Sequence, residues 1–188
     1  MKTYDVVLFL HIMSAVFGFG VAAVVHVMLF RLRSATDIRQ VRDQMPVLKV
    51  AEPLFPLAAV LLFGFGAYLI HLSDGDVTWG DGWIVTAIVA LVIVEGVGGA
   101  VIGRRSKVLN AAVDAAEDGP IDGTVRALLA DRGIWIGAHF NTAVIAAVVF
   151  LMTVKPDGVG SVVTVVIGAV IGIASALPYA KVPATAAA

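Results

Sequence analysis

The sequence lacks cysteine, is poor in charged residues and contains no recognisable catalytic motif. The absence of cysteine among 188 residues excludes disulfide bonds, iron–sulfur clusters and metal sites built from thiolates. Charged residues make up only 14% of the chain, and a formal net charge of −1 gives no basis for nucleic-acid binding. The sequence has no glycine-rich phosphate loop, no nucleophile elbow and no HExxH helix. We therefore predict no catalytic arrangement.

Apolar sequence is what the chain has in abundance. Apolar residues make up 60% of it and its mean hydropathy is +0.96, whereas soluble domains are nearer half apolar. Five apolar runs each reach the roughly 20 residues that a helix needs to cross a bilayer. They cover residues 4–30, 53–72, 83–102, 134–154 and 161–180. These runs predict an all-α polytopic bundle of five transmembrane helices, forming a single transmembrane domain over residues 1–188.

The basic residues predict how this bundle is oriented. They gather in two loops, residues 31–52 and 103–133, whereas residues 73–82 contain no Lys or Arg. By the positive-inside rule both basic loops are cytoplasmic, with the N-terminus outside and the C-terminus inside. We expect a multi-pass protein of a bacterial plasma membrane. Apolar positions in the loops predict short helices lying along the lipid headgroups. The loops are then either simple connectors or a docking surface for a cytoplasmic partner.

Small residues at helical spacing predict where the helices touch, because helices in lipid associate through close backbone approach. Four rows of this kind occur: Ser14, Gly18, Ala22 and His26; Gly64, Ala67 and His71; Glu95, Gly99 and Gly103; and Thr164, Gly168 and Gly172. Three tryptophans near the helix ends are interpreted as interfacial anchors: Trp79, Trp83 and Trp135. The predicted contacts are with the lipid bilayer and with partner membrane proteins or further copies of the chain.

Ionisable residues from three different helices are expected at one depth near the basic side. Counting about 1.5 Å per residue places His26, Glu95 and His139 roughly 6–10 Å inside the membrane, with Asn141 close by. Buried ionisable groups in membranes usually face the bundle interior and have a partner. This predicts a buried polar cluster that binds haem or a metal, relays protons, or only locks the helices together. His11 and His71 belong to the outer half, where their different depths make a shared haem awkward.

Several short stretches resemble a known family. They are Phe9-Leu10-His11-Ile12 followed by Gly18 and Gly20, residues 64–70 (GFGAYLI), Trp83, and residues 151–156 (LMTVKP). Over residues 4–156 the chain resembles the predicted integral membrane proteins of domain of unknown function 2269. The fifth helix would then be an addition to a four-helix core. That family is similar to the copper-resistance D proteins and to the membrane protoporphyrinogen oxidase of the J type. The resemblance implies haem b binding through the first-helix histidine, here His11.

The sequence thus predicts a non-enzymatic membrane component whose buried His/Glu cluster binds haem b or a metal. His11, His26 and His139 are the candidate ligands. Two alternatives remain open at this point. One is an accessory subunit of a larger membrane complex, and the other is a small proton-coupled transporter that depends on Glu95.

Overall fold

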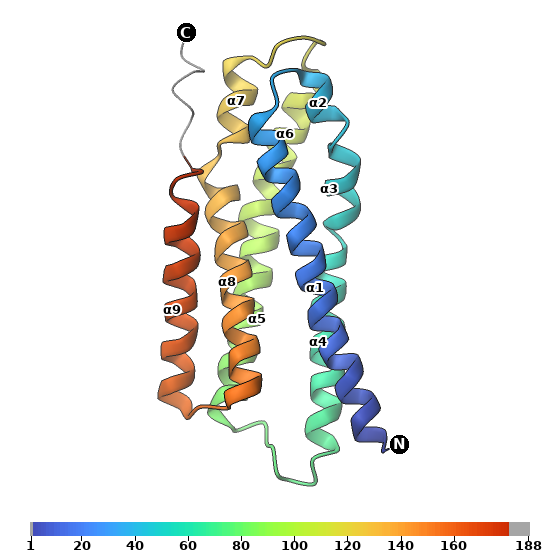
Figure 1. The fold of residues 1–188 in the computed structure, drawn as a ribbon, viewed down its shortest axis with the longest axis vertical. Coiled ribbons are helices and arrows are strands. Elements are labelled where there is room, and N and C mark those ends of the chain that lie inside the picture. Colours follow the sequence, from blue (N-terminus) through green and yellow to red (C-terminus); the bar gives the residue numbers. More distant parts are fainter. Residues whose placement is uncertain (1, 181–188) are drawn as a thin grey trace.

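The structure is a computed structural model that describes residues 2–180, and this part of the chain contains helices and no strand. Figure 1 shows an elongated helical bundle. The long helices are α1 (Thr3–Ser34), α4 (Leu54–His71), α5 (Gly82–Gly96), α8 (Arg132–Val154) and α9 (Gly158–Ala176). The shorter ones are α2 (Ile38–Arg42), α3 (Met45–Ala51), α6 (Arg104–Ala115) and α7 (Gly123–Leu129), with a π-helical segment, η1 (Val97–Gly103), joining α5 to α6.

The predicted transmembrane bundle is confirmed. Within residues 2–180, five helical segments are long and apolar enough to cross a bilayer: α1, α2–α4, α5–α6, α7–α8 and α9. The N-terminal end of α1 and the C-terminal end of α9 lie at opposite ends of the bundle, as an odd number of crossings requires (Figure 1). The predicted runs agree with the observed helices, although α9 begins and ends a few residues earlier than predicted.

Aspartates set the start of the last two long helices. The Asp131 carboxylate accepts hydrogen bonds from the backbone N–H groups of Gly133 (2.8 Å) and Ile134 (3.1 Å) at the start of α8. Asp157 accepts from Gly160 N–H (2.6 Å) at the start of α9. These side chains satisfy N–H groups that have no partner within the helix. Between the two helices, Lys155 ends α8 in the left-handed conformation (φ 51°), which turns the chain back on itself.

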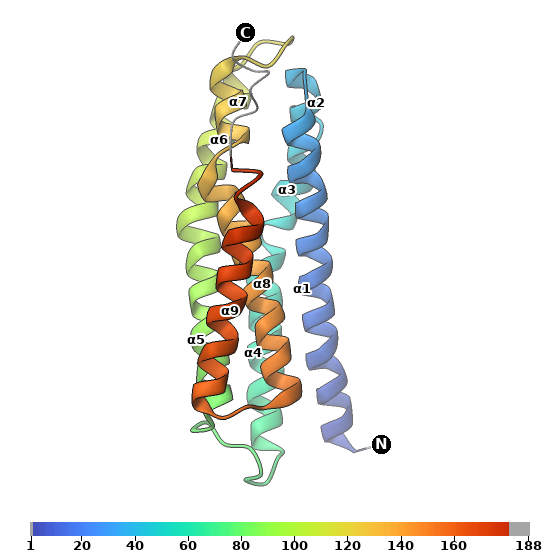
Figure 2. The same ribbon diagram turned by 60° about the vertical axis from the view of Figure 1, so that its left-hand side comes forward.

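The long helices form two groups (Figures 1 and 2). On one side α1 packs along α4, and on the other α8 packs between α5 and α9. The core of the second group consists of small or branched side chains facing one another: Ala87, Ala90 and Val94 of α5, and Val144, Val148 and Leu151 of α8. The groups meet where Leu29 of α1 contacts the start of α8 at Trp135. Trp135 is fully buried in this contact, so its interpretation as an interfacial anchor is wrong.

The packing contacts predicted from the small-residue rows are confirmed on α1 and α9 and are wrong on α4 and at the α5–η1 junction. Ser14 and Ala22 of α1 are buried, and Gly168 and Gly172 of α9 are buried against α8. In contrast, added Cβ atoms at Gly64 of α4, and at Gly96 and Gly99 beside Glu95, would meet nothing within 4 Å. Among the described residues, the rows on α4 and at the α5–η1 junction are therefore not packing faces.

The end of the bundle that carries both basic loops, called the basic end below, has an apolar core of its own. At about 1.5 Å per residue, the 32 residues of α1 span about 48 Å, well beyond a hydrocarbon layer of about 30 Å. Its last turn packs with α2, α6 and α7 around a shared cluster: Leu32, Ala35, Ile38, Val41, Met45, Leu109, Val113, Val125 and Leu129. The loops are thus more than simple connectors, because their apolar faces cover one another.

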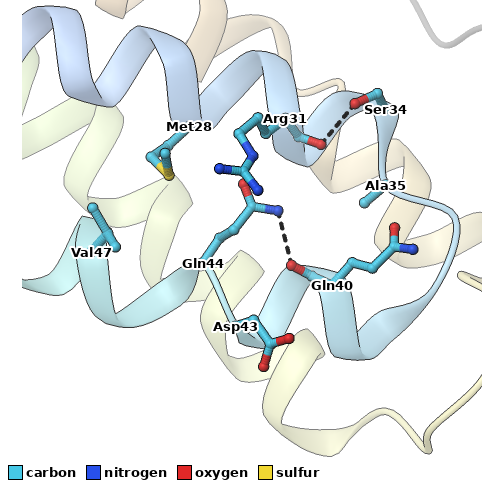
Figure 3. A pocket seen from close by; sticks show the side chains of 8 residues that line it. All are labelled: Met28, Arg31, Ser34, Ala35, Gln40, Asp43, Gln44 and Val47. Carbon is cyan, nitrogen blue, oxygen red and sulfur yellow. Dashed lines mark hydrogen bonds between the residues drawn. The ribbon is translucent and has the colours of Figure 1, made fainter.

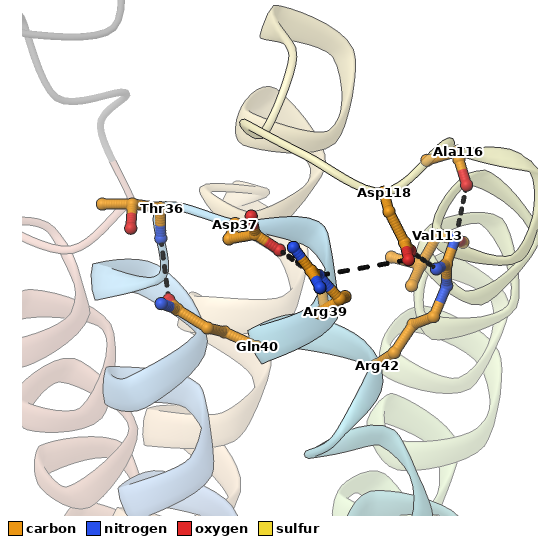
Figure 4. A network of polar contacts seen from close by, with 8 residues as sticks. All are labelled: Thr36, Asp37, Arg39, Gln40, Arg42, Val113, Ala116 and Asp118. Carbon is orange, nitrogen blue, oxygen red and sulfur yellow. Dashed lines mark hydrogen bonds and ion pairs between the residues drawn. The ribbon is translucent and has the colours of Figure 1, made fainter.

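Polar contacts close this basic-end core (Figure 4). The Arg42 guanidinium of α2 donates to the Asp118 carboxylate and to the Ala116 carbonyl, which lie just after α6. Ile38 N–H donates to the Gly119 carbonyl (2.9 Å), and Ile121 N–H donates to the Thr36 carbonyl (3.1 Å). The α1–α2 and α6–α7 connections are thereby held together.

Candidate functional site

The structure brings two of the predicted site residues into contact. The rings of His26 on α1 and His139 on α8 lie edge to face, with ring centroids 5.0 Å apart and an interplanar angle of 68°. Both side chains are half-buried. They are 113 positions apart in sequence, and the packing of α1 on α8 at the basic end puts them side by side. The shared depth of His26 and His139 predicted a cluster that also included Glu95 and Asn141.

Hydrogen bonds to the backbone identify Nδ1 as the donating nitrogen of both rings. His26 Nδ1 lies 2.8 Å from the Ala22 carbonyl oxygen, and His139 Nδ1 lies 3.0 Å from the Trp135 carbonyl oxygen. A carbonyl oxygen only accepts, so each Nδ1 must carry the proton and donate it. In a neutral imidazole the other nitrogen, Nε2, is then an acceptor with a free lone pair. Neither Nε2 has a hydrogen-bond partner among the described residues.

The histidine pair lines a groove between α1, α8 and α9 with a volume of about 590 Å³. Most of its wall is apolar, made of alanines, isoleucines and Gly168. Three hydroxyl groups also line it, and each donates to its own helix: Thr142 to the Ala138 carbonyl, Thr164 to Gly160 and Ser175 to Gly172. Every polar side chain in the groove therefore directs its proton to the backbone. The groove offers lone pairs to a ligand and no donor.

Aromatic side chains pack against the His139 ring. The His139 ring stacks on Tyr179 (centroids 5.6 Å apart), and Tyr179 stacks on Trp135 (5.2 Å). The Trp135 indole N–H donates to the Leu129 carbonyl (3.0 Å), which fixes the indole ring. Tyr179 is held in turn by Arg33 of α1, whose guanidinium donates to the Tyr179 carbonyl. Sequence reasoning missed Tyr179, because nothing local shows that the chain after α9 folds back over α8.

The other two members of the predicted cluster lie elsewhere. The Asn141 amide donates to the Val94 carbonyl of α5 (3.1 Å), and its Oδ1 atom is buried without a partner. Glu95 is partly exposed and makes no hydrogen bond or ion pair with any described residue. The structure therefore joins His26 to His139 and shows no bond from Glu95 or Asn141 to either histidine.

We expect Glu95→Gln to leave the thermal stability of the protein in detergent unchanged or slightly raised. The carboxylate has no partner to lose, and a neutral amide is less costly in a membrane span, where a charge costs about 2–3 kcal/mol. The measurement is the unfolding midpoint by circular dichroism, with Asp131→Ala as a control that removes a helix cap and an ion pair to Arg105. A Glu95→Gln midpoint as low as that of the control would mean that Glu95 has a structural partner.

His11 stands apart from the pair. Its Nδ1 atom lies 3.0 Å from the Leu62 carbonyl oxygen of α4, and the ring sits against Gly66, where an added Cβ would come within 3.2 Å of the imidazole. Fifteen residues of α1, about 22 Å, separate it from His26, so the two cannot share one ligand. Its visible contact is a hydrogen bond between α1 and α4. His71, at the end of α4, is exposed and stacks on Tyr68.

The histidine pair does not fit haem b as two axial ligands. An iron between two imidazoles places the ring centres about 6 Å apart, given metal–nitrogen bonds of about 2 Å, with a porphyrin in between. The observed 5.0 Å edge-to-face contact leaves no room for the macrocycle. Among residues 2–180, no three His, Cys, Asp or Glu side chains gather as a metal site requires. The free Nε2 lone pairs would suit a metal ion, but two nitrogens fall short of the usual three or four protein ligands.

Comparison with known proteins agrees with the fold. The sequence pattern of a family described as predicted integral membrane protein (DUF2269) matches residues 5–156. This range covers α1 to α8, including both histidines, and stops before α9, which supplies one wall of the groove. No curated protein and no solved structure matches the chain. Since the match extends over most of the sequence, the chain belongs to the DUF2269 family of predicted integral membrane proteins.

Proposed function

We propose that this integral membrane protein binds a lipid-soluble ligand that donates hydrogen bonds to His26 and His139. The observation that carries the proposal is the direction of the protons in the groove. Both imidazoles and all three hydroxyl groups donate to their own helices, so only acceptor atoms remain. Apolar pockets with a few convergent polar groups are the usual form of a small-molecule site.

The walls of the groove and its position further restrict the class of ligand that can bind. Its lining is mostly apolar and belongs to helices that are long enough to span a bilayer, so the ligand is expected to enter from the lipid. A hydroquinone with an apolar tail has the required chemistry, because its two hydroxyl groups donate and its tail remains in lipid. The corresponding quinone only accepts hydrogen bonds and finds no donor here. With the basic loops in the cytoplasm, as the positive-inside rule predicts, the groove opens in the inner leaflet.

In this proposal the protein is a binding component and not an enzyme. Haem b, as implied by the resemblance, would be held by His11, which does not line this groove. A metal ion would need ligands beyond the pair. The proton-coupled transporter and the accessory subunit stay predictions, and no contact among the described residues favours either over ligand binding.

The test compares the two redox forms of one probe. Purified protein is titrated with decylbenzohydroquinone under dithionite and, separately, with decylbenzoquinone, while tryptophan fluorescence is followed. Two hydrogen bonds to the pair, at about 0.5–1.5 kcal/mol each, predict about 5- to 150-fold tighter binding of the hydroquinone. The His26→Phe/His139→Phe double variant keeps all three tryptophans and controls for partition into detergent. Equal affinity for both redox forms would contradict the proposal. A stoichiometric Soret band in the same preparation would mean that the bound ligand is haem and not a hydroquinone.

A further inference from the structure

A second cavity, separate from the histidine groove, lies at the basic end. It has a volume of about 410 Å³ and opens between the last turns of α1 and the α2–α3 segment (Figure 3). Its lining runs from apolar to polar. Met28 and Val47 form one side, and Arg31, Gln40, Asp43 and Gln44 form much of the other.

Two opposite charges in this cavity are left without partners. Neither the Arg31 guanidinium nor the Asp43 carboxylate makes a hydrogen bond or an ion pair with another described residue. They are also not paired with each other, although both line the same cavity. A cavity with one cationic and one anionic group held apart is complementary to a zwitterion.

Gln44 adds a buried acceptor. Gln44 is only 9% exposed, and its Nε2 atom donates to the Gln40 carbonyl (2.9 Å). Its Oε1 atom is buried without a hydrogen-bond partner. Buried polar atoms are normally satisfied, so an orphaned acceptor at a cavity wall indicates a missing donor. Figure 3 shows the Gln44 carboxamide and the Arg31 guanidinium reaching toward one another across the cavity.

The cavity lies at the depth of lipid headgroups. Arg31 directly follows the apolar run of α1, which ends at Phe30. On the facing helix α3, Val47 is 41% exposed and Val50 is 66% exposed, which suits a helix bordered by lipid chains. Arginine at the end of a membrane span reaches the interface, where it meets phosphate groups.

We propose that this cavity binds the headgroup of phosphatidylethanolamine. Arg31 contacts the phosphodiester, because a guanidinium matches phosphate oxygens. The Asp43 carboxylate oxygens accept hydrogen bonds from the primary ammonium, and the acyl chains leave past Met28 and Val47. Phosphatidylcholine has no N–H group for these acceptors, and phosphatidylglycerol has no cation for Asp43. A soluble glycerophosphoethanolamine has the same polar chemistry without the chains.

The experiment is native mass spectrometry of the full chain, released from detergent after equilibration with each of the three lipids. We expect retention of phosphatidylethanolamine with an apparent affinity about tenfold above that of the other two, from hydrogen bonds to charged groups. Arg31→Gln and Asp43→Asn should each remove this preference. Lys49→Gln and Glu52→Gln change the same charges on the neighbouring segment outside the cavity lining, and they should retain it.

The other outcomes overturn the proposal. Equal retention of the three lipids, or unchanged selectivity in Arg31→Gln and Asp43→Asn, means that the cavity does not distinguish one headgroup from another. Competition by free glycerophosphoethanolamine at the same concentration as the lipid means that the ligand is soluble and the lipid assignment is wrong. Because both substituted residues are exposed, unfolding midpoints equal to the wild type are expected and are checked in parallel.

Discussion

Gly172→Ala should displace α9 from α8 and lower the stability of the protein more than any other single-methyl change considered. A Cβ atom at this position would lie 2.7 Å from Phe140 Cα and 2.8 Å from the His139 carbonyl oxygen, so backbone and not a flexible side chain has to move. Overpacking of this kind costs about 1–3 kcal/mol. For a chain of this length each kcal/mol lowers the unfolding midpoint by about 2–4 °C. Because Gly172 follows the groove wall, binding of decylbenzohydroquinone should weaken as well.

The matched control is Gly64→Ala on α4, where an added Cβ would meet nothing within 4 Å. Alanine is the better helix former by about 1 kcal/mol, so this variant should be as stable as the wild type or more so. A Gly172→Ala protein with an unchanged midpoint and unchanged binding would show that α9 does not pack on α8 as described.

His139→Phe should raise the dissociation constant for decylbenzohydroquinone by about 5- to 150-fold. The phenyl ring keeps the stacking on Tyr179 but removes the Nε2 lone pair, and a buried donor left without its acceptor costs about 1–3 kcal/mol. His26→Phe should act in the same direction. Both variants should bind the quinone as the wild type does, because the quinone makes no use of the lone pair.

His71→Phe is the matched control, since His71 is exposed at the far end of α4 and stacks only on Tyr68. Its affinity for hydroquinone should equal that of the wild type. If His139→Phe and His71→Phe bind the probe equally, the histidine pair does not form the site.

Composition and run length were sufficient to predict the membrane bundle, but not which small-residue rows are contacts. The rows through Gly99 and through Gly172 look alike in sequence, yet only the second meets a neighbour. The difference depends on how each helix is rotated about its axis. That rotation is set by α8, whose fully buried Leu151 and Val144 face α5 while Ala143 and Ala147 receive the α9 glycines.

The same reasoning explains why half of the candidate site was predicted. Depth along a helix can be counted from sequence, and the count put His26 and His139 at one level, where their rings are in contact. Direction around the helix could not be counted without knowing the partner helices. His139 and Asn141 are two residues apart, so their side chains point about 200° apart, and Asn141 bonds to α5 instead.

The basic end was the least predictable part. Apolar positions in the loops predicted short helices there, and Ile38 and Val41 of α2 and Met45 of α3 are buried. The partner of these side chains was not evident, because the opposing side chains Val113 and Val125 belong to helices whose position depends on the long extension of α5 through η1 and α6.

The most direct test of the central claim is ¹⁵N magnetic resonance of the histidine rings in the detergent-solubilised protein, assigned by single His→Phe variants. In His26 and His139, Nδ1 should be protonated and Nε2 unprotonated, and the Nε2 resonances should shift when decylbenzohydroquinone is added. Protonated Nε2 atoms in both rings, or resonances that do not respond to the hydroquinone, would contradict a groove that presents only acceptors.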